Sequence, residues 1–296
     1  MELSTLLILF FIGIFIGSFL NVIALRYRPG GRLLQHHVLG GRSACRTCST
    51  QLRWYELVPL FSFFVQGTKC RHCSHALSWQ YPIVEFVAGL LTAALPATLY
   101  GFFNVAQLLA RGESIFWFYG VVGIWLLATY IFVVIAVIDL RYRIIPDQAS
   151  GLLAILGLGL LVLKSNFSAL FAYNGSFFKS YATIFGGQGG PFVNALLAVL
   201  LGVVLFGGIV LFTKGRGMGL GDLKLAIPIA LLLGWPDVIL AFASAFIVGS
   251  LCAIPLLLHK VKKMSDGIPF GPFMIIGVYI AIFYGVQISQ WYFSLI

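Results

Sequence analysis

Residues Ser114–Ile138 read SIFWFYGVVGIWLLATYIFVVIAVI, an uncharged segment that ends directly before Asp139. About 20 apolar residues are enough for a helix to cross the hydrocarbon core of a bilayer. The rest of the chain has the same character, because 60% of its residues are hydrophobic and only 9% are charged. A soluble domain carries about 25% charged residues. The mean hydropathy of +1.00 agrees with a chain that lies in a membrane.

Apolar segments of spanning or nearly spanning length recur along the whole sequence. They cover residues 3–25, 82–104, 115–138, 148–163, 191–213, 220–235, 238–258 and 271–294, and the fourth and sixth are the shortest. We therefore predict an all-α polytopic membrane protein with about eight transmembrane helices. Its parts would be a first helix at 1–25, a cytoplasmic zinc-binding loop at 26–81 and a transmembrane domain at 82–296.

The basic residues predict the orientation of the chain. Sixteen of the 19 Lys and Arg residues lie in alternate connections: the loop 26–81, the end of the third span, the start of the sixth and the connection before the eighth. Loops rich in Lys and Arg face the cytoplasm. Both termini are then expected outside, with Asp139 and Asp222 at the cytoplasmic edge. The net charge of +10 follows from this topology, so no nucleic-acid partner is expected.

The loop 26–81 contains four cysteines in two Cys-x-x-Cys pairs, Cys45 with Cys48 and Cys70 with Cys73. This spacing is typical of a zinc site, because each pair turns two thiolates toward one ion and four thiolates complete a tetrahedral shell. A four-sulfur shell has no open position, so the predicted zinc is structural. The reducing cytoplasm favours metal over disulfides. Two disulfides or four unliganded thiols are the alternatives.

Two acidic residues stand at the edges of apolar segments, where a carboxylate is costly and often functional. Asp139 follows the third span, and Asp222 closes the glycine-rich turn Gly217–Gly221. Glycines let the backbone bend close to a ligand. Two close carboxylates share one proton, so one can act as a general base on water while the other donates a proton. The pair suggests an aspartyl peptidase at a membrane surface, although each aspartate could instead be a helix-end residue.

Four other features each have a structural interpretation. Glu85, about one turn inside the second span, is either the partner of a basic residue or part of a site. Asp147 fits a cap of the fourth span, and Cys252 fits a packed apolar residue in the seventh. The apolar piece 57–65 is too short to span, so it packs in the loop or dips into the membrane interface.

Several motifs follow one another in a characteristic order. They are Gly17-Ser18-Phe19-Leu20-Asn21-Val22, Gly41-Arg42-Ser43-x-Cys45 with the second cysteine pair, Tyr81-Pro82-x-x-Glu85, the segment from Asp139 to Pro146-Asp147, Gly219-Leu220-Gly221-Asp222-Leu223-Lys224, and Pro269-Phe270-Gly271-Pro272-Phe273. Together they resemble the type IV prepilin peptidases, the leader peptidase/N-methyltransferase family of bacterial type IV pili and type II secretion. The resemblance covers nearly the whole chain.

This resemblance implies a bifunctional enzyme of the bacterial inner membrane. It would cut the leader from prepilins or pseudopilins at the cytoplasmic face, with Asp139 and Asp222 as catalytic residues. It would then methylate the new N-terminal residue with S-adenosylmethionine. Monofunctional relatives lack the cysteine loop, and this chain has it. The motifs do not show which residues would bind the methyl donor. The alternatives are a peptidase without methyl transfer, a transporter with intramembrane carboxylates, and a zinc-loop scaffold without chemistry.

Overall fold

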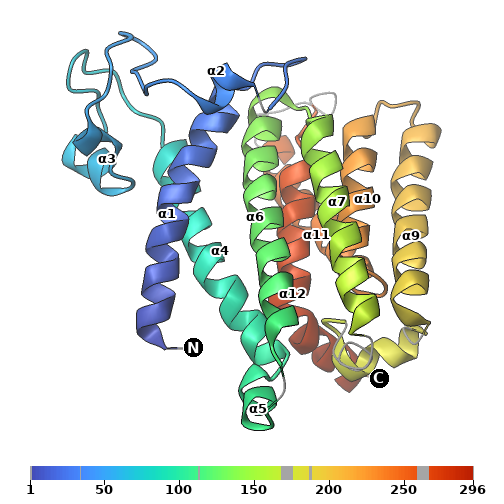
Figure 1. The fold of residues 1–296 in the computed structure, drawn as a ribbon. Coiled ribbons are helices and arrows are strands. Elements are labelled where there is room, and N and C mark those ends of the chain that lie inside the picture. Colours follow the sequence, from blue (N-terminus) through green and yellow to red (C-terminus); the bar gives the residue numbers. More distant parts are fainter. Residues whose placement is uncertain are drawn as a thin grey trace. The chain divides into compact units, whose positions relative to one another are not determined.

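The protein is described by a computed structural model over residues 2–33, 35–112, 114–167, 176–186, 189–258 and 267–295. Within these ranges the named elements are all helices, and two isolated β-bridges in the cysteine loop are the only strand-like pairing. The prediction of an all-α protein is therefore confirmed (Figure 1).

The long helices occupy the eight predicted positions. They are α1 (Leu3–Arg26), α4 (Gln80–Phe102), α6 (Phe116–Tyr142), α7 (Asp147–Asn166), α9 (Gly190–Phe212), α10 (Leu220–Leu233), α11 (Asp237–Leu258) and α12 (Gly271–Ser294). Shorter helical elements connect them: α2 (His36–Leu39), η1 (Trp54–Leu57), α3 (Phe61–Val65), α5 (Val105–Ala110) and η2 (Lys179–Phe185).

Seven of the long helices in the described part of the chain are long and apolar enough to cross a membrane. The exception is α10, the sixth predicted span, which has 14 residues. At a rise of about 1.5 Å per residue it is about 21 Å long, shorter than the ~30 Å hydrocarbon core. It ends early because Gly234 takes a positive φ of 83° and terminates the helix. This segment is thus a helix that cannot cross the core alone.

The chain divides into two compact units. The first unit comprises Met1–Arg111 and Trp125–Ile138, and the second comprises Gly112–Ile124 and Asp139–Ile296. The long helix α6 contributes residues to both units. The domain boundaries expected from the sequence, at residues 25/26 and 81/82, stay predictions.

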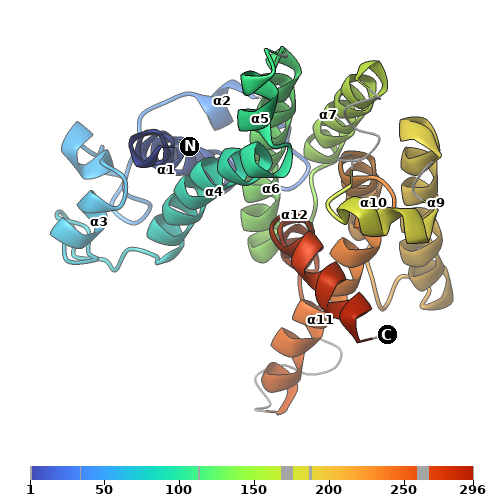
Figure 2. The ribbon, with the colours of Figure 1, turned by 90° about the horizontal axis from the view of Figure 1, so that it is seen from below.

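In the first unit, α1 packs along α4, as the views from the side and from below show (Figures 1 and 2). Small residues make this approach possible. A Cβ atom at Gly13 would lie 2.5 Å from Thr92 Oγ1, and one at Gly17 would lie 2.6 Å from the Cβ atom of Ala88. Such small-residue interfaces let membrane helices come close enough for van der Waals packing along their length.

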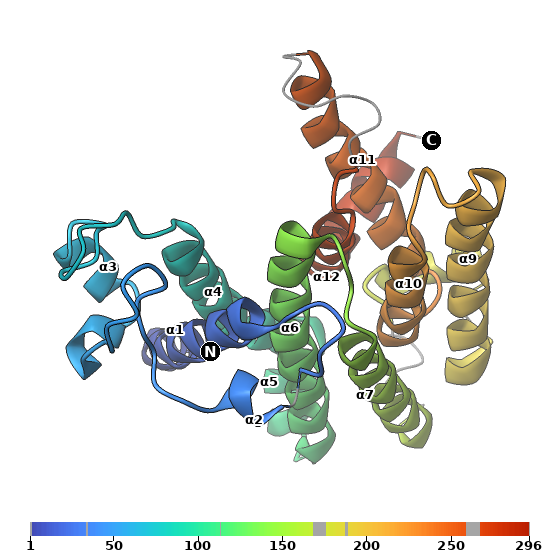
Figure 3. The same ribbon diagram turned by 90° about the horizontal axis from the view of Figure 1, so that it is seen from above.

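In the second unit, α10 packs against both α7 and α9, and α11 packs against α12 (Figure 3). Half of the residues of α10 are buried, among them Leu225, Ala226, Ile229 and Leu232. A helix that is apolar on most of its circumference has to be covered by neighbours. The short α10 is therefore a packed internal helix, and its N-terminal turn carries Asp222.

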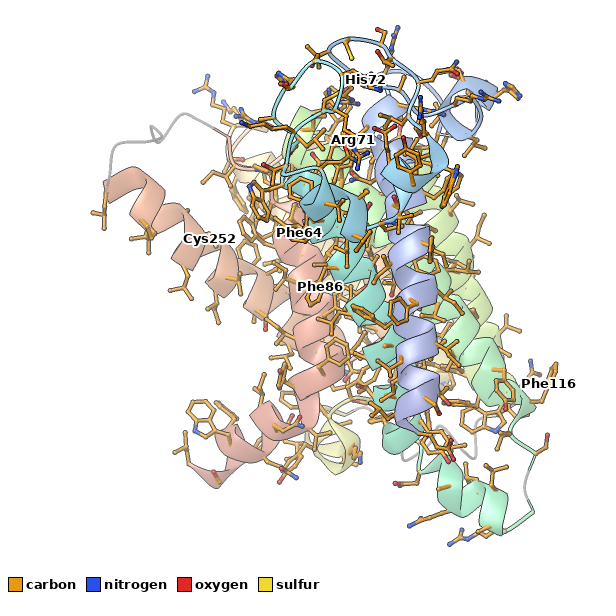
Figure 4. All side chains as sticks on the ribbon, turned by 90° about the vertical axis from the view of Figure 1, so that its left-hand side faces the viewer. Phe64, Arg71, His72, Phe86, Phe116 and Cys252 are labelled. Atoms are coloured by element: carbon orange, nitrogen blue, oxygen red, sulfur yellow. The ribbon has the colours of Figure 1, made fainter. Side chains whose placement is uncertain are left out.

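Cys252, predicted as a packed residue, is exposed on α11 (Figure 4). Leu251 and Ile254 of the same turns are exposed too. The prediction was wrong because α11 is apolar on all sides, so the sequence does not distinguish its packed face from its outer face.

Candidate active site and metal centre

Asp139 lies in the last turn of α6 and is only 4% exposed. Its Oδ2 atom accepts a hydrogen bond of 3.0 Å from the backbone N–H of Gly271, the first residue of α12. The first N–H groups of a helix have no partner within that helix, and the helix dipole favours a negative charge there. The start of α12 therefore provides a partner for an ionised carboxylate that would otherwise be costly to bury.

Gly271 is the residue at this site that the sequence reasoning missed. A Cβ atom at position 271 would lie 2.7 Å from Asp139 Oδ2, so a larger residue would displace the carboxylate. The signal was present in the Pro269–Phe273 motif, where Pro272 occupies a favoured position at a helix start. The motif predicted a helix start there but gave no reason to pair it with Asp139.

Asp222 lies in the first turn of α10 and is half-buried. Its Oδ2 atom accepts a hydrogen bond of 3.3 Å from the backbone N–H of Gly219. The carboxylate of Asp139 is near enough to repel that of Asp222 electrostatically. Each aspartate thus has one backbone donor and one like-charged neighbour.

Ile145 lies next to Gly221 and Gly271, the glycines that adjoin Asp222 and Asp139. A Cβ atom at Gly221, next to Asp222, would lie 3.5 Å from Ile145 Cβ, and one at Gly271 would lie 3.6 Å from Ile145 Cδ1. The ends of α6, α10 and α12 therefore meet around one apolar side chain in the second unit. An apolar neighbour lowers the local dielectric and strengthens the interaction between the two carboxyl groups.

Asp147 forms an ion pair with Lys224, with Lys224 Nζ 2.7 Å from Asp147 Oδ1. Both side chains are largely exposed, so the pair contributes at most about 1 kcal/mol. The N-cap of α7 is Pro146 rather than Asp147, which is the first helical residue. The predicted cap was thus wrong by one position. The carboxylate still lies at the favourable end of the helix dipole.

The four cysteines of the loop come together as a group that could hold a metal ion. Their Sγ atoms all lie within 4.8 Å of one another, and the Sγ atoms of Cys45 and Cys73 are 3.8 Å apart. Four sulfurs placed about 2.3 Å from a tetrahedral zinc ion would be separated by about 3.8 Å. All four cysteines are free, so the disulfide alternative is not observed. The arrangement fits the predicted zinc site.

Hydrogen bonds at Cys48 and Cys70 favour the thiolate form that binds metals. Hydrogen bonds with the backbone of Cys73 and of His72 lower the pKa of the Cys70 thiol. Hydrogen bonds with Thr50 lower the pKa of Cys48 to about 6. Antiparallel bridges between Ala44 and Gln51 and between Lys69 and Ala76 close the two cysteine turns.

Glu85 connects the cysteine loop to the membrane helices of the first unit. It is buried, and its Oε2 atom accepts a hydrogen bond of 2.7 Å from the backbone N–H of Leu60. The hydroxyl of Ser18 in α1 is also a hydrogen-bond partner. Among the described residues, no basic side chain forms an ion pair with Glu85. The carboxylate instead holds the start of α3 against α1 and α4.

Two family models match the chain. Residues 11–99 match the model described as Bacterial Peptidase A24 N-terminal domain, which includes the cysteine loop. Residues 125–254 match the Type IV leader peptidase family, and this part includes Asp139 and Asp222.

Similar proteins carry the name prepilin leader peptidase/N-methyltransferase. One from Aeromonas hydrophila is 28% identical over 307 residues, covering 97% of this chain and 93% of its own. One from Bacillus subtilis is 29% identical over 289 residues, covering 97% and 98%. One from Pseudomonas aeruginosa is 27% identical over 303 residues, covering 95% and 91%. No solved structure matches the chain with significance.

Proposed function

This chain belongs to the type IV leader peptidase family, and on that basis we propose that it cleaves the leader peptide of prepilins or pseudopilins and then methylates the new N-terminus. The observation that supports the peptidase proposal is that Asp139, at the end of α6, lies near enough to Asp222, at the start of α10, for their carboxylates to repel each other. A pair of carboxylates with backbone N–H partners is the chemistry that peptide hydrolysis needs.

The two aspartates share one proton and act as a unit. The ionised carboxylate takes a proton from a water molecule, whose oxygen attacks the carbonyl carbon of the scissile peptide bond. The protonated carboxyl group donates its proton to the carbonyl oxygen. When the C–N bond breaks, the carboxyl group that took the proton from water passes it to the leaving amine. The other carboxylate takes back a hydroxyl proton of the tetrahedral intermediate, so the pair is again singly protonated. The N–H groups of Gly271 and Gly219 stabilise the negative charge on the pair throughout.

The protein is a multi-pass membrane protein, and we place the aspartates at the cytoplasmic face. The basic loops support this orientation, with both termini outside the cytoplasm. The site would then meet the basic leader of a prepilin while the apolar helix of the substrate stays in the bilayer. Nucleic acid has no part in this function.

The methyl-transfer activity is assigned to the first unit, which carries the cysteine loop. Cys45, Cys48, Cys70 and Cys73 would hold one zinc ion, which acts as a structural crosslink of the loop. S-adenosylmethionine would be the methyl donor. The names of the relatives support this proposal, and so does the presence of the loop.

Single substitution of each aspartate tests the peptidase proposal. Asp139→Asn and Asp222→Asn should each abolish cleavage of a model prepilin by the purified protein, because neither variant can hold and release the shared proton. Asp147→Asn, which changes an exposed carboxylate nearby, is the matched control and should cleave within a few-fold of the wild type. Near-normal cleavage by Asp139→Asn or Asp222→Asn would remove that residue from the catalytic pair.

A further inference from the structure

The loop helix α3 presents an exposed apolar face. Phe61, Phe64 and Val65 lie at helical spacing on one side of α3 and are 66%, 58% and 55% exposed, and the neighbouring Trp79 is 59% exposed. The rings of Phe64 and Trp79 are in contact, with their centroids 6.3 Å apart. These four residues are called the aromatic face. Large apolar side chains gathered in this way on a protein surface indicate an interaction site.

The aromatic face is held in a fixed position. Phe63, which is buried, lies beneath it with its ring centroid 5.1 Å from that of Trp79. The start of α3 is tied down by the hydrogen bond from the Leu60 N–H to the buried carboxylate of Glu85. The aromatic face is therefore exposed while its base is packed, and the buried side chain of Glu85 in α4 helps to hold it there.

The aromatic face continues the exposed apolar surface of α4. Trp79 is the N-cap of α4, and the first turns of that helix expose a stripe that includes Ile83, Phe86 and Leu90. In Figure 4, Phe64 lies directly beyond Phe86 toward the loop, whereas His72 lies at the far end of the loop. The aromatic face thus starts where a span leaves the hydrocarbon core. Trp and other amphipathic aromatic residues are enriched at that depth.

The charge of the loop complements an anionic membrane. Residues 26–81 contain eight Lys and Arg residues and a single acidic residue, Glu56, which is buried. Lys69 and Arg71, close to α3 in the chain, are both exposed. Anionic lipids attract basic segments that lie within a Debye length of the bilayer surface. An apolar patch within a basic segment is the pattern of elements that lie in the membrane interface.

We propose that the aromatic face inserts into the headgroup region of an anionic phospholipid bilayer and holds the cysteine loop against the membrane surface. This role goes beyond peptide cleavage and methyl transfer and does not depend on either. A second copy of the chain or the apolar helix of a pilin could also cover such a face. The continuity with α4 and the excess of basic residues favour lipid.

Photocrosslinking in a defined bilayer tests the proposal. Benzoyl-phenylalanine would replace Phe64 in the full-length protein, reconstituted in nanodiscs of phosphatidylglycerol and phosphatidylcholine. The same replacement at Phe86 serves as the lipid-facing reference, and at His72, exposed on the same loop, as the control. After irradiation, mass spectrometry should find phospholipid adducts at positions 64 and 86 and none at 72. Retained zinc content would show that the loop is folded.

Several outcomes would overturn the proposal. The first is a lipid adduct at position 86 without one at position 64. The second is an adduct between position 64 and a second copy of the chain. The third is the loss of the lipid adduct at position 64, in favour of a peptide adduct, when prepilin is added. A second measurement covers the case in which crosslinking is inefficient. Phe61→Ser/Phe64→Ser should make trypsin cut the loop several-fold faster in these nanodiscs, whereas His37→Ser, at an exposed position of the same loop outside the cysteine turns, should not. Equal rates for wild type and double variant would also contradict lipid docking.

Discussion

Replacing Gly271 by Ala changes one contact of the candidate active site. The added methyl group would lie 2.7 Å from Asp139 Oδ2, closer than real contacts allow, and only 3.6 Å from Ile145 Cδ1. The carboxylate of Asp139 has to move, and its hydrogen bond from the Gly271 N–H is then lost or distorted. The helix itself should not suffer, because Ala is a better helix former than Gly by up to about 1 kcal/mol.

The size of the effect follows from that hydrogen bond. A hydrogen bond to a charged group contributes about 1.5–3 kcal/mol, and about 1.36 kcal/mol corresponds to a factor of ten. Gly271→Ala should therefore slow prepilin cleavage by about 10- to 150-fold if the whole bond is lost in the transition state. Thermal unfolding in detergent should be unchanged or shifted slightly upward.

The matched control is Gly267→Ala in the same connection. A Cβ atom at Gly267 would have no neighbour within 4 Å among the described residues, so cleavage should stay at the wild-type rate. The assay is the initial rate of leader removal from a model prepilin in detergent or nanodiscs. A Gly271→Ala variant with a rate within two-fold of the control would refute the proposed role of the start of α12 in holding Asp139.

Three further predictions follow from the other contacts. Zinc should be released on acidification, because protons compete with the metal for the four thiolates of Cys45, Cys48, Cys70 and Cys73. Metal release to a chromogenic chelator across a pH series measures this, and zinc release that does not depend on pH would contradict it. The double variant Cys45→Ser/Cys48→Ser should lose its zinc, and methylation should suffer more than cleavage. Mass spectrometry of the product measures both activities. Equal loss of both would mean that the loop also supports the peptidase site. Glu85→Ala should speed trypsin cleavage of the loop, because the Leu60 N–H loses its acceptor. Glu85→Gln keeps an acceptor and should restore much of the protection. An unchanged rate for Glu85→Ala would show that this hydrogen bond does not hold the loop.

The parts of the fold with a local sequence signal were predicted well. The long helices formed where the apolar segments lie, and the cysteines gathered because each Cys-x-x-Cys pair is a local turn. The length of α10 was overestimated because a run of apolar residues looks alike in a spanning helix and in a packed internal one. The helix ends at Gly234, which has a positive φ. The apolar content of the segment does not predict where such a glycine ends a helix.

The contacts of the candidate site were much less predictable. The donor on Asp139 is a backbone N–H 132 residues away in the chain, and a backbone group has no residue-type signature. The pairing of Asp147 with Lys224 likewise depends on how α7 packs against α10. The same holds for Glu85, whose partner is the backbone N–H of Leu60 rather than a basic residue. The sequence showed which carboxylates would be costly to bury. Only the packing of the helices showed which groups stabilise them.

One chain that removes a leader peptide and then methylates the product should leave both changes on a single substrate. The mass of the N-terminal peptide of a model prepilin, after incubation with the purified zinc-loaded protein and S-adenosylmethionine in anionic nanodiscs, reports both. We expect a leaderless peptide that is heavier by one methyl group, and no product with Asp139→Asn or Asp222→Asn. An intact leader with the wild-type protein would contradict the peptidase assignment, and a cleaved but unmethylated peptide would contradict the methyltransferase assignment.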